Sequence, residues 1–245
     1  MRAFPRSVVV AGVAATACAA LLAGCGADDE PSKPVAEDTP ATSAPVTPAP
    51  TTPAPETSAP STPDPATLSD RLLLTAQVPG LNAQWHWQDG RTAQLGTEPS
   101  NICAQASLVD IGATNGVFRT FFPPDDSDDN AAQQIAVFPD AKTTASAWSV
   151  LKSWQLRCGE AISADVKIRA GAPVAVRTSA DEASWYLVTS QPMGEETGRF
   201  DAVGMIRKGT TISVLTMTNS GQDYSYPKGK EPMVAMVKAA AAKLG

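Results

Sequence analysis

Histidine is almost missing from this sequence, which has one histidine among 245 residues. That excludes a zinc site or a catalytic dyad that needs two imidazole rings. Charged residues make up only 18% of the chain and aromatic residues 6%, and the 25 acidic side chains outnumber the 19 basic ones. This acidic balance argues against a nucleic-acid-binding protein, because such a protein needs a basic face for phosphates.

The first 24 residues have the pattern of a secretory signal peptide. Arg2 and Arg6 supply positive charge, and residues 7–22 form an apolar segment rich in alanine and valine. Residues 7–24 are just long enough to be a transmembrane helix, but no basic stop-transfer cluster follows them. We therefore expect residues 1–24 to be removed on export.

Residues 22–25 read Leu-Ala-Gly-Cys, which resembles the lipobox of bacterial lipoproteins. The resemblance implies that Cys25 becomes the N-terminal residue and carries a thioether-linked diacylglycerol. Two or three acyl chains anchor a protein firmly. We therefore expect a lipid-anchored protein on the extracytoplasmic face of the cell membrane. The mature chain would keep 17 basic and 25 acidic residues, so its membrane contact would depend on the acyl chains and not on a basic patch.

Residues 25–66 comprise the lipidated cysteine and a stalk of distinct composition. Between residues 31 and 67 there are 11 prolines and 12 serines or threonines, and no aromatic residue. Such a segment cannot bury enough apolar surface to offset the entropy of ordering it. We expect a disordered, semi-rigid spacer with polyproline II character. Its composition leaves both an O-glycosylated and an unmodified stalk open.

Residues 67–245 have the composition of a globular domain. About 180 residues suffice to bury a core. Two cysteines remain here, Cys103 and Cys158, and in an exported chain an even pair indicates a disulfide. Two free buried thiols are the alternative. A metal site is not expected, because neither cysteine has a second cysteine or a histidine at ligand spacing.

Hydrophobic periodicity predicts three helices and an antiparallel sheet in this domain. The helices are expected over residues 67–77, from the cap Asp140 to about Cys158, and from about Glu231 onward. With short turns between strands and helices at both ends and in the middle, we expect an α+β fold whose helices pack on one face of the sheet. The expected strands are 84–88, 117–122, 134–138, 174–177, 184–190, 200–207 and 211–218.

The order of these features resembles a known family. A lipidated leader and a Thr/Pro stalk precede a head with one cysteine before a strand pair and one at the end of the helix that starts at Asp140. The segment Gly-Gln-Asp-Tyr-Ser-Tyr-Pro at 221–227 precedes the last helix. This arrangement is similar to actinobacterial cell-envelope lipoproteins related to the PknH-like extracellular sensor domain of a Ser/Thr kinase.

The resemblance implies a disulfide-braced α+β head with a cleft that senses a ligand. The sensor domain of that family carries two disulfides, whereas this head can form only one. The sequence has no Gly-rich loop with its lysine and no His-Arg-Asp segment, so it contains no kinase. Any signalling would require a partner.

No catalytic motif stands out in the sequence. A Ser-His-Asp scheme would have to use His86, which lies between two tryptophans on an expected strand. The string from Ser149 to Lys152 matches Ser-x-x-Lys but lacks the other elements of the serine-acylase pattern. Acidic residues are abundant, yet nothing selects two of them as an acid–base pair. The acidic run between Asp125 and Asp129 fails the EF-hand spacing and is interpreted as a solvated hairpin tip.

Aromatic residues provide the candidate ligand-binding surface. Tyr224 and Tyr226 lie in a Gly/Ser/Pro-flanked loop, and Trp85 and Trp87 alternate on an expected strand. The leading hypothesis is a non-enzymatic ligand-binding or sensing module of the cell envelope. The alternatives are a lipid or glycolipid carrier and a cell-wall hydrolase that uses two carboxylates. We expect no cofactor and no nucleic-acid partner; the partner would be an envelope glycan, lipid or protein.

Overall fold

The computed structural model describes residues 65–159, 166–221 and 225–245. The leader, Cys25, residues 26–64 of the predicted stalk and Tyr224 lie outside these ranges. Residues 57–245 form one compact unit. Both hydrophobic cores and both disulfide cysteines lie between residues 68 and 244, so this unit contains the contacts that stabilise its own fold.

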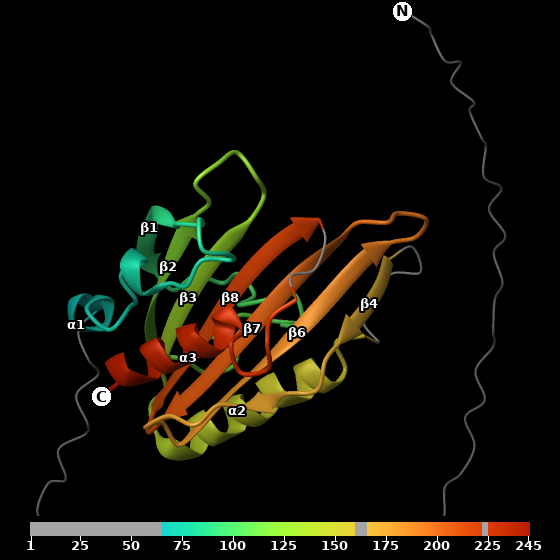
Figure 1. Ribbon diagram of the computed structural model, residues 1–245. Helices are drawn as coiled ribbons and strands as arrows, with labels where there is room; N and C mark the ends of the chain where they lie inside the picture. The colour runs from blue at the N-terminus through green and yellow to red at the C-terminus, as the bar shows by residue number, and fades with distance from the viewer. Residues whose placement is uncertain (1–64, 160–165, 222–224) are drawn as a thin grey trace, which may run out of the picture. The chain divides into compact units, whose positions relative to one another are not determined.

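The described residues form an antiparallel eight-stranded sheet with three α-helices and one 3-10 helix (Figure 1). None of these helices is long and apolar enough to cross a membrane. In chain order the elements are α1 (Pro65–Ser69), η1 (Thr75–Gln77), β1 (Gln88–Gln94), β2 (Asn115–Phe122), β3 (Asn130–Val137), α2 (Ala141–Leu156), β4 (Val166–Ala170), β5 (Val174–Ala175), β6 (Glu182–Pro192), β7 (Gly198–Lys208), β8 (Thr211–Gly221) and α3 (Pro232–Lys243).

The strands pair in the order β1-β2-β3-β8-β7-β6-β4, and the two-residue β5 pairs with β6. The long strands β6, β7 and β8 form the middle of the sheet through continuous antiparallel registers. The β7–β8 hairpin turns at Gly209, whose φ of 55° lies in the left-handed region that glycine tolerates best. The short turn implied between the expected strands 200–207 and 211–218 is therefore present.

The helices cover both faces of the sheet, which differs from the expected packing on one face. Alternate residues of the central strands belong to two separate cores: Met205 packs in the core beside α2, and Ile206 packs in the core beside α3. In Figure 1, α3 lies in front of the central strands and α2 behind them. The α+β class, the antiparallel sheet and the single disulfide are confirmed, and the physical reason for the difference is that both sides of β7 and β8 are apolar.

Helix α2 is fixed at both of its ends. At its start the Asp140 carboxylate accepts a hydrogen bond from the Thr143 backbone N–H at 2.7 Å, which holds the pKa of Asp140 below its usual value. Just past its end, Cys158 is joined to Cys103, with 5.0 Å between their Cα atoms. The predicted cap and the predicted disulfide are therefore both present.

Helix α3 lies close to the sheet because β7 has a glycine beneath it. A Cβ added to Gly204 would lie 2.6 Å from Cγ2 of Val237 and 2.8 Å from Sδ of Met233. Both of these α3 side chains are fully or almost fully buried. The missing side chain at Gly204 therefore sets how closely the helix approaches the strand.

Replacing Gly204 by alanine is expected to lower the free energy of unfolding by about 1–3 kcal/mol, because the new methyl group overpacks a tight core. Urea unfolding measures this loss. The control is Gly96→Ala, whose added Cβ would meet nothing within 4 Å. Both substitutions reduce the conformational entropy of the unfolded chain by the same amount. Equal free energies of unfolding for the two variants would therefore contradict the close contact between α3 and β7.

Candidate ligand-binding site

The two predicted tryptophans lie in a loop and not in a strand. Strand β1 begins at Gln88, so the strand expected over residues 84–88 is wrong except for its last residue. The rings of Trp85 and Trp87 pack edge to face with centroids 5.4 Å apart. Trp87 is buried, and its Nε1 donates to the carbonyl oxygen of Pro79 at 2.8 Å. Trp87 thus holds the loop against the core, where it contributes apolar burial.

Tyr226 connects this loop to the segment that leads into α3. Its hydroxyl donates to the carbonyl oxygen of Leu81 at 2.6 Å. Two segments that lie 145 residues apart in the sequence are therefore joined at one point. Leu81 is itself buried in the core on the α3 side of the sheet.

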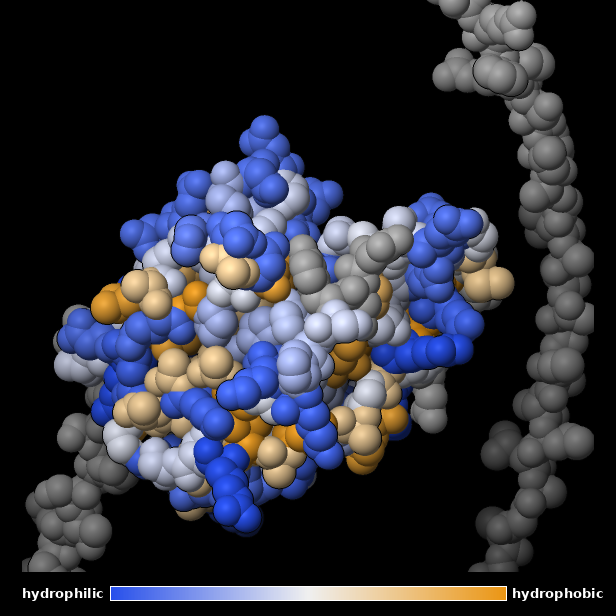
Figure 2. Space-filling model, in the orientation of Figure 1, coloured by the Kyte–Doolittle hydropathy of each residue, from blue (hydrophilic) through white to orange (hydrophobic). Residues whose placement is uncertain are grey.

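A largely apolar cavity of about 280 Å3 opens beside this hydrogen bond, and we name it the α3 cavity. The strands β6, β7 and β8 supply its floor, and the start of α3 supplies one wall. Figure 2, which has the orientation of Figure 1, shows hydrophobic side chains at the surface beside α3 with hydrophilic ones around them. The lining residues are Leu81, Trp185, Leu187, Ala202, Met217, Asn219, Ser225, Tyr226, Glu231, Pro232 and Met233.

Two polar atoms of the residues that line the α3 cavity are buried and have no hydrogen-bond partner among the described residues. They are Nε1 of Trp185 and Oε2 of Glu231. Glu231 occupies the N-cap position of α3, yet its side chain makes no capping hydrogen bond. Buried polar groups are normally paired, and leaving one unpaired costs about 1–3 kcal/mol. A ligand with an acceptor and a donor would satisfy both atoms once the Trp185 and Glu231 side chains turn toward the cavity, because both atoms are closed to solvent in the described positions.

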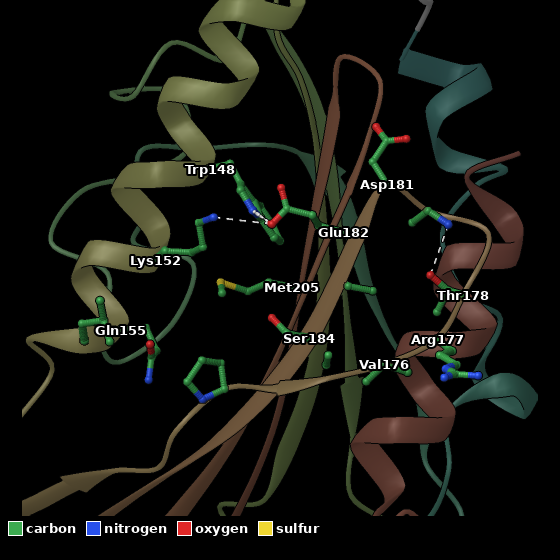
Figure 3. A pocket seen from close by; sticks show the side chains of 15 residues that line it. Trp148, Lys152, Gln155, Val176, Arg177, Thr178, Asp181, Glu182, Ser184 and Met205 are labelled. Atoms are coloured by element: carbon green, nitrogen blue, oxygen red, sulfur yellow. Dashed lines mark hydrogen bonds and ion pairs between the residues drawn. The ribbon is translucent and has the colours of Figure 1, made fainter.

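A larger hollow of about 560 Å3 lies on the other side of the sheet edge, between α2 and the β5–β6 hairpin (Figure 3). We name it the α2 hollow. Glu182 is its central charged group. Oε2 of Glu182 accepts from Nε1 of Trp148 at 2.8 Å and lies 3.4 Å from Nζ of Lys152, while Oε1 lies 3.0 Å from a guanidinium nitrogen of Arg207.

These contacts keep Glu182 ionised. Burial by itself would raise the pKa of Glu182, but the hydrogen bonds from Trp148 and Arg207 and the charge of Lys152 hold the pKa below its usual value. The neighbouring Asp181 also pairs with Arg207, at 3.6 Å. A general acid needs a raised pKa, so Glu182 is better suited to joining α2 to β6 than to protonating a leaving group.

The acidic run at the β2–β3 turn makes hydrogen bonds within the turn and to the neighbouring strand β8. Asp125 accepts from the backbone N–H of Ser127, and the buried Asp129 accepts from the backbone N–H of Ser220 at 2.8 Å. Among the residues that the structure describes, no three His, Cys, Asp or Glu side chains are grouped closely enough to hold a metal ion.

Of the predicted ligand-binding residues, Tyr226 lines the α3 cavity. Trp85 and Trp87 pack in the adjoining loop without lining it. Tyr224 lies outside the described residues. Trp185 and Glu231 line the cavity but were not predicted as ligand-binding residues. Trp185 and Tyr186 are neighbours on β6, so their side chains point to opposite faces of the sheet. The sequence of a strand does not tell which of its two faces carries a cavity.

The comparisons with known proteins concern the fold. No family model and no curated protein matches the chain. Among solved structures, the chain is similar to the extracellular domain of PknH from Mycobacterium tuberculosis, with a TM-score of 0.50 and 13% sequence identity. The match covers 74% of this chain and 96% of that domain. The described head therefore shares its fold with that extracellular domain.

Proposed function

We propose that this chain is a lipid-anchored protein of the cell envelope whose head binds a ligand in the α3 cavity as a non-enzymatic binding or sensing module. The observation that carries the proposal is the apolar cavity with two buried, unpaired polar atoms, on Trp185 and Glu231. An apolar hollow with a few convergent polar groups is the usual form of a small-molecule site. The shared fold with the extracellular domain of PknH supports an extracytoplasmic head, and the Leu-Ala-Gly-Cys sequence supports the anchor at Cys25.

Native mass spectrometry of the full chain, purified from its own host in a mild detergent, tests both parts of this proposal. The covalent mass is expected to show loss of residues 1–24 and addition of acyl groups at Cys25. A non-covalent adduct is expected on the same protein at low collision energy.

Two variants serve as controls for the two readouts. Cys25→Ala is expected to abolish the added acyl mass. Leu187→Arg, which places a charge in the α3 cavity, is expected to remove the adduct. An unprocessed chain would refute the anchor, and an adduct that persists in Leu187→Arg would refute the α3 cavity as the binding site.

A further inference from the structure

A third hollow, of about 370 Å3, adjoins the α3 cavity, and we name it the basic recess. The two hollows share Trp185 and Glu231. Three cationic residues line the basic recess: Arg177 from the β5–β6 hairpin, Lys228 from the loop before α3, and Lys238 from α3. In Figure 3, Arg177 lies on the α3 side of the hairpin.

The three cations of the basic recess are available to a ligand. All three are exposed. Within residues 65–159, 166–221 and 225–245, the ion pairs use Lys152, Arg199 and Arg207 instead. Glu231 is the one acidic residue among those that line the recess. The recess therefore has an excess of positive charge, which complements a phosphate group.

The unpaired polar atoms lie on the two residues that the hollows share. Nε1 of Trp185 can only donate a hydrogen bond, and the unpaired Oε2 of Glu231 can accept one. A molecule that lies across both hollows would have to offer an acceptor to Trp185 and a hydroxyl group to Glu231. A hydroxyl-bearing phosphate ester has both groups.

We infer that the two hollows together bind one molecule of an anionic lipid with a hydroxyl-bearing phosphate head group. The acyl chain occupies the α3 cavity, the phosphate lies among the three cations of the basic recess, and a head-group hydroxyl donates to Glu231. This inference rests on the proposed function, because it names the ligand class of the same site. A neutral apolar ligand would leave the cations and both buried polar atoms unused, and a free phosphate would leave the apolar cavity empty.

Isothermal titration calorimetry of residues 57–245 with lysophosphatidylglycerol, kept below its micelle concentration, tests the inference. Saturable binding of one lipid per protein is expected. Affinity is expected to rise about fourfold for each added methylene group that becomes buried and to level off once the chain fills the cavity. Lysophosphatidylcholine of equal chain length, which carries an added positive charge, is expected to bind at least tenfold more weakly, and glycerol 3-phosphate is expected not to bind.

Variants of the lining residues test which of them contact the head group of the lipid. Replacing Arg177, Lys228 and Lys238 together by glutamine is expected to weaken binding about tenfold, since exposed ion pairs each contribute modestly. The matched control replaces three exposed cations that line neither hollow, Lys142, Arg157 and Lys167, and is expected to leave affinity unchanged. Trp185→Phe keeps the apolar ring and removes the donor, and is expected to weaken binding about fivefold. Circular dichroism confirms that each variant is folded.

Three results would each overturn the inference. They are equal affinity for the two lysolipids, binding of glycerol 3-phosphate, and binding to phosphatidylglycerol vesicles without binding to the monomeric lysolipid. So would a matched control that loses as much affinity as the recess variant. A host-derived adduct of another chemical class, found together with no binding of lysophosphatidylglycerol, would overturn the anionic-lipid inference and leave the proposed function standing. Absence of both would refute both.

Discussion

Replacing Cys103 and Cys158 together by alanine is expected to lower the free energy of unfolding by about 4 kcal/mol. The bridge joins residues 55 positions apart, and a cross-link of that span removes a large part of the conformational freedom of the unfolded chain. Both cysteines are also buried, in the core beside α2. Urea unfolding of residues 57–245, with tryptophan fluorescence as the readout, measures the change.

The unmodified protein in excess reductant is the control for this variant. Reduction breaks the bridge without removing sulfur atoms from the core, so it isolates the effect of the cross-link. A loss in reductant close to that of the double variant is expected. If reduction cost less than about 1 kcal/mol while the double variant cost 4 kcal/mol, the packing of the two sulfurs, and not the chain constraint, would account for the stability.

The amphipathic helices could be predicted because their signals are local. Ala147, Leu151, Trp154 and Cys158 follow helical spacing in the sequence, and all four are buried in the structure. Met233, Val237, Ala240 and Leu244 have the same spacing at the last helix, and all four lie in the core. Helical spacing fixes which side of a helix is apolar. It does not fix which side of a sheet receives that helix.

A signal for two covered faces was nevertheless present in the central strands. Residues 203–206 and 211–215 are buried without a break, whereas a strand with one exposed face alternates. These runs are consecutive apolar or small residues in the sequence. Short apolar runs of this length, bounded by turn residues, indicate strands that are buried on both sides. Such strands require a covering layer on both faces of the sheet.

Two strand predictions failed for different reasons. Strand β4 (Val166–Ala170) was missed although Val-Lys-Ile-Arg-Ala alternates as an edge strand does. The segment around Trp85 and Trp87 alternates equally well but is a loop, because the Trp87 indole bonds to Pro79 and packs the segment against the α3-side core. A tertiary contact overrode the local pattern there.

The floor of the α3 cavity had no local signal in the sequence. The lining of the cavity comes from the loop before β1, from three strands, from the loop before α3 and from the start of α3. The register of β6 against β7 places Leu187 opposite Ala202, and that of β7 against β8 places Ala202 opposite Met217. Such a floor exists only once three strands are paired, so periodicity along one strand cannot reveal it. The loop before α3 could be located in the sequence, and Tyr226 was predicted as a ligand-binding residue for that reason.

Replacing Gln133 by methionine is expected to lower the free energy of unfolding by about 2–4 kcal/mol. Gln133 is fully buried on β3, where its Oε1 accepts from the Leu73 backbone N–H at 2.7 Å and its Nε2 donates to Oγ of Ser213 at 3.2 Å. Methionine has nearly the same shape, so the loss reports the hydrogen bonds and not a cavity. Each buried group left without its partner costs about 1–3 kcal/mol. Urea unfolding of residues 57–245 measures the change.

The adjacent Gln134 provides a matched control on the opposite side of the same strand. Its Oε1 is buried and has no partner among the described residues, so replacing Gln134 by methionine removes an existing penalty. A change of less than about 0.5 kcal/mol, or a gain in stability, is expected for Gln134→Met. Two neighbouring glutamines with the same substitution would then differ by 2 kcal/mol or more. Equal losses would show that methionine disturbs β3 itself, and that the Leu73–Gln133–Ser213 contacts do not hold the segment after α1 against the sheet.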